Sequence, residues 1–184
     1  MGQTAQPVLP VPWKVSSLTC DSSPSLAVLG CADGKFVLPA ARRGFSVLAV
    51  DVDHVALYGG PKPGIGGLVS MPGLVSRLGT EGLVRRVDVV CADFATVTPR
   101  PMDSVFISGA IQHSRNLPRT AEELLNAALG FVRPGGLFYL DYMLPYEAKY
   151  IGRPNCPGAE WWRQRLTRLD GWHVVHHRGL ASGS

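Results

Sequence analysis

The sequence predicts an α/β fold in which helices cover both faces of a mostly parallel sheet, a three-layer α/β/α sandwich. Apolar runs typical of buried strands alternate along the chain with segments of helical periodicity. A turn rich in glycine, from Gly30 to Gly34, follows the first apolar run and precedes the first helical segment. The second apolar run ends on Asp51. Doubly wound sheets use this order of strand, glycine turn, helix, strand and acid to bind an adenosine cofactor at the carboxyl ends of their strands.

Length and composition indicate one globular domain. The chain has 184 residues, of which 46% are hydrophobic and 17% are charged, and this balance excludes a disordered chain. The formal net charge is +4, but the arginines are dispersed along the sequence, so we expect no nucleic-acid partner. We expect an irregular, proline-rich arm over residues 1–24, the cofactor-binding domain over 25–178 and a short tail over 179–184.

The first half of the domain is expected to contribute three strands and two helices. In chain order these are strand 26–29, helix 34–43, strand 45–51, a broken helix 68–78 and strand 87–91. Asp33 is placed to cap the first helix, Pro39 lies near enough to its start to be tolerated, and Gly44 ends it. Residues 58–67 contain so many Gly and Pro residues that they are expected to form an irregular loop.

The second half is expected to contribute three more strands. Its elements are strand 104–108, helix 119–132, strand 137–142, helix 159–169 and strand 172–177. Thr120 suits the capping position of its first helix, and Arg133-Pro134-Gly135-Gly136 stops that helix. Cys31 and Cys91 lie at or beside predicted buried strands, where free thiols behave as small hydrophobes, as in a reducing compartment. Neither a signal pattern nor a membrane span is recognisable, so we expect a cytoplasmic protein without a membrane partner.

Five motifs in the order and spacing of one family give the chain a resemblance to class I S-adenosylmethionine-dependent methyltransferases over residues 25–177. The matching segments are 28–34, Asp51, Asp93-Phe94, 109–113 and 132–136. The resemblance implies a Rossmann-like fold and S-adenosyl-L-methionine as cofactor. Within the family the chain looks most similar to small-molecule enzymes of the tellurite-resistance and thiopurine methyltransferase type. The family's usual seventh strand is lacking, and a homodimer through the exposed sheet edge is one way to complete the sheet.

The resemblance also implies the residues of the cofactor site. These are Gly30, Cys31, Ala32, Gly34, Asp51, Val52, Asp93, Phe94, Ser108 and Gly109. Within that set, Asp51 corresponds to the acid that holds the ribose, and Asp93 to the acid that contacts the adenine amine. Ala32 departs from the family pattern, because it replaces the middle glycine of the first motif.

Methyl transfer from a sulfonium is an in-line displacement, which requires alignment of the reacting groups and no metal ion. Three catalytic candidates lie at the carboxyl ends of the last two central strands: His113, Asp141 and Tyr142. His113 could act as a base toward a small-molecule acceptor, or it could simply shape the loop. Asp141 and Tyr142 could bind an acceptor amine or hydroxyl, while Asp141 could equally cap a turn. His173, His176 and His177 are spaced along a predicted strand, which disfavours a shared metal ion.

Two other functions remain open from the sequence. A nicotinamide-dependent oxidoreductase would share the glycine turn and Asp51, although the turn lacks the Gly-x-Gly-x-x-Gly spacing. A non-catalytic module that binds S-adenosylmethionine and serves as a partner subunit would account for Ala32 and the missing strand.

Overall fold

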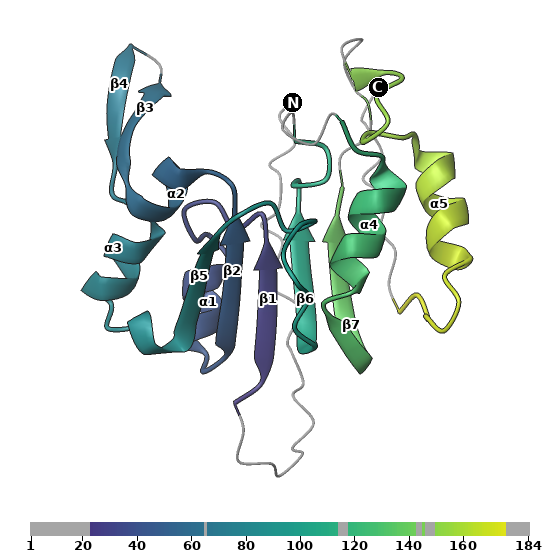
Figure 1. Cartoon of the computed structure of the whole chain (residues 1–184), viewed down its shortest axis with the longest axis horizontal. Helices are drawn as coiled ribbons and strands as arrows, with labels where there is room; N and C mark the ends of the chain where they lie inside the picture. The colour runs from purple at the N-terminus through teal and green to yellow at the C-terminus, as the bar shows by residue number, and fades with distance from the viewer. Residues whose placement is uncertain (1–22, 65, 114–117, 143–144, 146–149, 176–184) are drawn as a thin grey trace, which may run out of the picture.

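A single parallel sheet of five strands organises the computed structural model, which describes residues 23–64, 66–113, 118–142, 145 and 150–175 (Figure 1). The sheet strands are β1 (Ser25–Leu29), β2 (Ser46–Asp51), β5 (Val87–Cys91), β6 (Met102–Ser108) and β7 (Val132–Asp141). Their order in space is β5-β2-β1-β6-β7, and every neighbouring pair is parallel. Counted along the chain this is the order 3-2-1-4-5 of a Rossmann-like sheet. The predicted fold class is confirmed.

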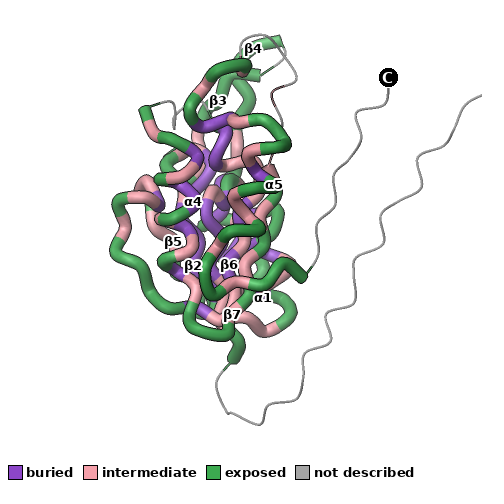
Figure 2. The backbone as a smooth tube through the Cα atoms, turned by 90° about the vertical axis from the view of Figure 1, so that its right-hand side faces the viewer, coloured by how far each residue is buried: buried purple, intermediate pink, exposed green. Residues whose placement is uncertain are grey.

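Two hydrophobic cores lie on opposite faces of the sheet, because successive strand side chains point to opposite sides. Ala27 and Leu29 of β1 join one core, whereas Val28 joins the other. The first core is covered by α4 (Ala121–Leu129) and by Trp162 of α5 (Ala159–Thr167). The second is covered by α1 (Val37–Arg42), α2 (His54–Tyr58) and α3 (Gly73–Thr80). The buried positions accordingly run through the middle of the molecule in Figure 2.

The two principal helix starts differ in how they are capped. Thr120 caps α4 as predicted: its Oγ1 accepts a hydrogen bond from the Glu123 amide at 3.1 Å, and Glu123 accepts one from the Thr120 amide at 2.7 Å. The prediction that Asp33 caps the first helix is wrong. Helix α1 begins later, at Val37, and has no side-chain cap, because its N-cap residue is Phe36. The Asp33 carboxylate pairs with Arg77 of α3 at 3.0 Å.

A β-ribbon replaces the loop expected over residues 58–67. Strands β3 (Gly60–Gly64) and β4 (Gly67–Met71) pair antiparallel, so the expected start of a helix at Leu68 is also wrong. Prolines in β3 are tolerated because this two-stranded ribbon leaves one edge of each strand unpaired. Only the part from Gly73 onward is helical, as α3, and the short helix α2 before the ribbon was not predicted.

The carboxyl-terminal part deviates from expectation at three points. Strand β7 starts at Val132 and takes in the Pro-Gly-Gly segment, with a register shift opposite β6 between Met102 and Ser104. Residues 172–175 form no strand, which contradicts the predicted sixth strand there, and 176–177 lie outside the described residues. Cys91 is exposed rather than buried, because it ends β5, an edge strand of the sheet.

The expected arm over 1–24 and the tail over 179–184 fall almost wholly outside the described residues. Among the helices that the structure does describe, none has the length and apolar character needed to cross a bilayer.

Candidate active site

The strand order reverses between β1 and β6, which makes the carboxyl ends of these two strands the switch point of the sheet (Figure 1). In open α/β sheets, ligands bind at such a switch point. The turn Gly30–Gly34 follows β1 there, Asp51 ends β2, Ser108 ends β6 and Gly109 follows it. The fold therefore brings most of the predicted cofactor residues to one edge.

Hydrogen bonds tie the glycine turn to the neighbouring strand. The amides of Gly30 and Cys31 both donate to the carbonyl of Val50 on β2, at 2.8 and 3.1 Å. Gly30 has a φ of 74°, and a Cβ placed on it would lie 2.4 Å from the Cβ of Ala110, in the loop after β6. Glycine is required at position 30 by its backbone conformation and by the close approach of these two loops.

Ala32 adopts a φ of 47° and is the one residue other than glycine, among those described, that has a positive φ. A left-handed conformation costs an alanine about 1–2 kcal/mol. The turn thus keeps the backbone shape that glycine would adopt freely, although its middle residue carries a methyl group.

The carboxylate of Asp51 is oriented by two backbone amides. Its Oδ2 accepts a hydrogen bond from Ala32 at 2.7 Å, and its Oδ1 accepts one from Asp53 at 2.8 Å. Each carboxylate oxygen has a second lone pair, so Asp51 can still accept hydrogen bonds from ligand hydroxyls. Asp53 caps α2, and its hydrogen bond with Lys62 of the β-ribbon lowers its pKa.

The remaining predicted cofactor residues differ in what they can offer. Asp93 is engaged by the Ala95 amide and by Arg119, each at 2.9 Å. The Phe94 side chain packs into the core, and burial raises the pKa of the Cys31 thiol well above its ordinary value. Val52, in contrast, is 36% exposed next to Asp51. Contacts to a cofactor from Phe94 and Cys31 would therefore come from the backbone.

Among the catalytic candidates, Asp141 is held next to the end of β6. Its Oδ2 accepts a hydrogen bond from Ser108 Oγ at 2.8 Å, and its carbonyl accepts one from the Gly109 amide at 3.1 Å. His113 is exposed in the loop after β6. The Tyr142 ring stacks on Trp162 at 4.5 Å, and burial raises the pKa of its phenol. The structure thus brings together Ser108, Gly109 and Asp141, and it packs Tyr142 as an aromatic wall.

Sequence reasoning missed a buried polar pair beside His113. Gln112 is 1% exposed, and within the described residues neither Nε2 nor Oε1 of its side chain has a hydrogen-bond partner. Asn155 is fully buried, and its Nδ2 donates to the carbonyls on either side of Gln112, those of Ile111 and His113, at 3.0 and 3.1 Å. Gln112 lies in the motif after β6, but nothing local in the sequence signals its burial.

No group of three His, Cys, Asp or Glu side chains arranged to hold a metal ion occurs within the described ranges. His173 is described and exposed, whereas His176 and His177 fall outside those ranges.

Comparison with known proteins adds information on the fold. No family model and no curated protein matches the chain. One similar solved structure is geranyl diphosphate C-methyltransferase from Streptomyces coelicolor A3(2), with 13% sequence identity and a TM-score of 0.49 over 63% of this chain and 36% of that chain. The [4+2]-cyclase SpnF has 20% identity and a TM-score of 0.48 over 64% of this chain and 38% of that chain. The glycopeptide N-methyltransferase MtfA has 17% identity and a TM-score of 0.47 over 65% of this chain and 47% of that chain. The chain therefore matches less than half the length of each of these proteins.

Proposed function

We propose that the chain is an S-adenosylmethionine-dependent methyltransferase that acts on a small-molecule acceptor. The observation that carries the proposal is the Asp51 carboxylate, fixed by the Ala32 amide at 2.7 Å beside the switch point of the sheet. An acid in this position suits the ribose hydroxyls of an adenosyl ligand. The five motifs that resemble the methyltransferase family favour S-adenosylmethionine over a dinucleotide. The narrower similarity to tellurite-resistance and thiopurine enzymes is part of the same proposal.

The residues at the switch point fit such a ligand. Gly109 has a φ of 64°, and a Cβ added to it would meet no atom within 4 Å, so a ligand can approach its backbone. Asp51 retains lone pairs for ribose hydroxyls, and the exposed Val52 offers an apolar contact. Asp93 shares its carboxylate with Arg119, so an adenine amine would have to use its remaining lone pairs.

When bound, S-adenosylmethionine supplies an electrophilic methyl group, and the work of the chain is to align the acceptor and exclude water. We assign His113 as the base, because it is exposed in the loop after β6 and a neutral imidazole can accept a proton. Asp141, oriented by Ser108, would bind an acceptor amine or hydroxyl. Tyr142 would form a wall and would not accept the proton, since burial raises its pKa.

A thermal melt with different ligands tests the proposed cofactor. A ligand at 100 times its Kd adds about 2.7 kcal/mol to the free energy of unfolding, which shifts the Tm of a domain of this size by roughly 5–11 °C. We expect this shift with S-adenosylmethionine and with S-adenosylhomocysteine, and none with NADH or NADPH. A shift with the nicotinamides alone would replace the proposal by an oxidoreductase.

The non-catalytic module remains the second candidate, because Ala32 is strained and Asp93 is already paired with Arg119. A methyl-transfer assay over a broad panel of acceptors distinguishes the two candidates, and a His113→Gln variant then tests the base. An enzyme that uses His113 as base loses turnover and keeps its affinity for S-adenosylhomocysteine. A module binds the same ligand and transfers no methyl group to any acceptor in a broad panel.

We further propose a homodimer formed through the sheet edge at β7. In the described part of the chain, β7 pairs only with β6, and its Leu137 and Tyr139 are 54% and 49% exposed. Unpaired strand edges with apolar side chains favour association. Sedimentation should show a dimer that Leu137→Lys dissociates, whereas Leu68→Lys on the ribbon should leave it intact. A monomeric wild type would contradict this proposal.

A further inference from the structure

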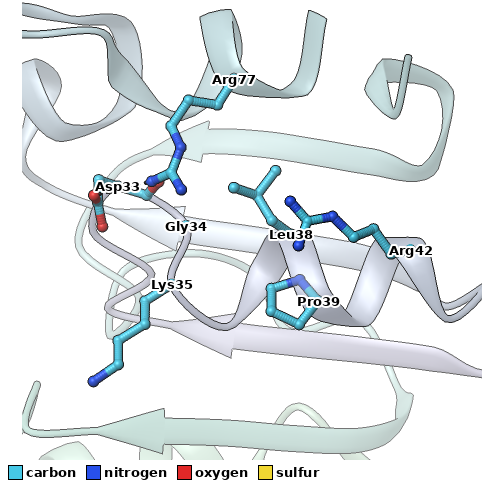
Figure 3. A pocket seen from close by; sticks show the side chains of 7 residues that line it. All are labelled: Asp33, Gly34, Lys35, Leu38, Pro39, Arg42 and Arg77. Atoms are coloured by element: carbon cyan, nitrogen blue, oxygen red, sulfur yellow. Dashed lines mark hydrogen bonds and ion pairs between the residues drawn. The ribbon is translucent and has the colours of Figure 1, made fainter. Parts of the chain in front are cut away.

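A hollow of about 360 Å³ opens on the flank of α1 that faces α3, outside the switch point at the carboxyl edge (Figure 3). It is lined by Asp33, Gly34, Lys35, Leu38, Pro39, Arg42 and Arg77. Arg77 and Arg42 approach Leu38 from different sides in Figure 3, while the Lys35 ammonium points away from them. Its floor is apolar, formed by Leu38 and Pro39, and its walls carry the two guanidinium groups.

Both arginines are fixed in orientation by a carboxylate. Glu81 binds Arg42 through Nε and Nη2, each at 2.6 Å, which leaves Nη1 of Arg42 available. Arg77 uses only Nη1, toward the carbonyl and the carboxylate of Asp33 at 2.8 and 3.0 Å. The hydrogen bonds of Arg77 within the described part of the chain come from Nη1, so Nε and Nη2 can donate to a ligand. Donors held in place lose less freedom when they bind an anion.

The hydrogen-bond donors around the hollow favour an anion. Arg42 is paired with Glu81 and Arg77 with Asp33, so the one positive charge in excess is that of Lys35, whose ammonium points away from both arginines. The attraction for an anion therefore comes from the guanidinium N–H groups that the carboxylates leave open. Guanidinium groups match the geometry of phosphate oxygens, with which they form paired hydrogen bonds. We propose that this hollow binds a phosphate-bearing small anion, held between Arg42 and Arg77.

The site shares Asp33 and Gly34 with the glycine turn, but it does not depend on the proposed methyl transfer. The apolar side chains in the hollow should bind two kinds of phosphate compound differently. A phosphate ester with a ring can also contact Leu38 and Pro39, whereas an inorganic oligophosphate would use the guanidinium groups alone.

Calorimetric titration with inorganic pyrophosphate and with phenyl phosphate, at low ionic strength and without adenosyl ligand, tests the proposal. We expect saturable 1:1 binding of at least one probe, weakened about tenfold in Arg42→Gln and in Arg77→Gln. Glu81→Gln removes the carboxylate that competes for Arg42, so it should tighten binding several-fold. Tighter binding of phenyl phosphate would identify an ester, and tighter binding of pyrophosphate an inorganic anion.

Arg100→Gln is the matched control, because Arg100 is also an exposed arginine paired with one carboxylate, that of Asp88 at 2.9 Å. Its probe affinity should equal that of the wild type. No saturable binding of either probe would overturn the proposal. Equal weakening in Arg100→Gln, or weaker binding in Glu81→Gln, would overturn it as well.

Discussion

The Asp51 carboxylate and the Ala32 amide are joined by a hydrogen bond of 2.7 Å, which links the end of β2 to the turn after β1. The same carboxylate also accepts a hydrogen bond from the Asp53 amide at 2.8 Å. One side chain therefore fixes the backbone of the two loops that follow β1 and β2, beside the switch point of the sheet. An acid with this role couples the stability of the turn to the binding of a ligand.

Asp51→Asn should weaken both functions of this residue. Its amide group keeps one neutral acceptor oxygen, so one of the two backbone amides loses its acceptor and the other loses the charge on its acceptor. We expect a loss of about 1–3 kcal/mol in the free energy of unfolding. The affinity for S-adenosylhomocysteine should fall at least about tenfold, because hydrogen bonds to a charged group are the stronger ones. Urea unfolding and calorimetry measure the two effects.

Asp88→Asn provides the control for this prediction, because Asp88 makes an exposed ion pair with Arg100 on the edge strand β5. Exposed pairs contribute about 0–1 kcal/mol, so the control should stay close to the wild type in both measurements. Unchanged ligand affinity in Asp51→Asn would remove Asp51 from the site.

Ala32→Gly should stabilise the protein, because glycine adopts the φ of 47° without the strain that alanine carries. Removing the strain of the left-handed conformation should add about 1–2 kcal/mol to the free energy of unfolding. The greater conformational entropy of glycine in the unfolded chain should take back about 0.5–1 kcal/mol of this gain. Ala40→Gly in α1 is the opposite control and should destabilise by about 1 kcal/mol. Chemical denaturation compares them. Destabilisation by Ala32→Gly would mean that the methyl group makes contacts that outweigh the strain.

Gln112→Leu should also stabilise the protein, since it replaces a buried amide, without hydrogen-bond partners in the described part of the chain, by an apolar group of similar size. The unsatisfied group costs about 1–3 kcal/mol, and the substitution should recover part of it. Asn155→Leu removes two hydrogen bonds to the carbonyls of Ile111 and His113, so it should destabilise. If both variants lose stability in a urea melt, Gln112 has a structural partner such as a buried water.

Stability should fall in acid through Asp103, which links β1 to β6. Hydrogen bonds from Ser25, and then the bond from Arg133, hold the pKa of the Asp103 carboxyl below its ordinary value of 3.8. A carboxyl group whose pKa is lower in the folded than in the unfolded protein stabilises the folded state at pH values above its unfolded pKa. This stabilisation is lost as the pH falls through the pKa of the folded state. Wild type should therefore lose stability from about pH 4 downward. Asp103→Asn should show a flatter profile, and an equally steep one would contradict this assignment.

Much of the fold could be predicted because its signals are local. The apolar runs at Leu26 and Val47 correspond to β1 and β2, and Thr120 with Glu123 forms the predicted capping box. The ribbon over 60–71 could not be recognised, because Gly and Pro are equally typical of loops and of tight hairpins. The expected strand at 172–177 had suitable residues, but residues 172–175 pair with no other strand.

The positions of Gly30 and Asp51 beside the switch point could be expected from the sequence, because each directly follows or ends a strand with a clear apolar run. The candidate site was not predictable where the partner comes from far along the chain. Asp33 looks like a helix cap until Arg77, 44 residues later, takes its carboxylate. The surroundings of Gln112 likewise depend on Asn155, whose amide binds the carbonyl of Ile111 from 44 residues away.

Calorimetric titration of the full chain with S-adenosylhomocysteine, run beside NADH and with Asp51→Asn in parallel, tests the central claim most directly. We predict saturable 1:1 binding of S-adenosylhomocysteine, at least about tenfold weaker binding in the variant, and no heat of binding with NADH. Binding of NADH alone, or equal affinity of wild type and variant for S-adenosylhomocysteine, would contradict the assignment of this edge of the sheet to an adenosyl cofactor.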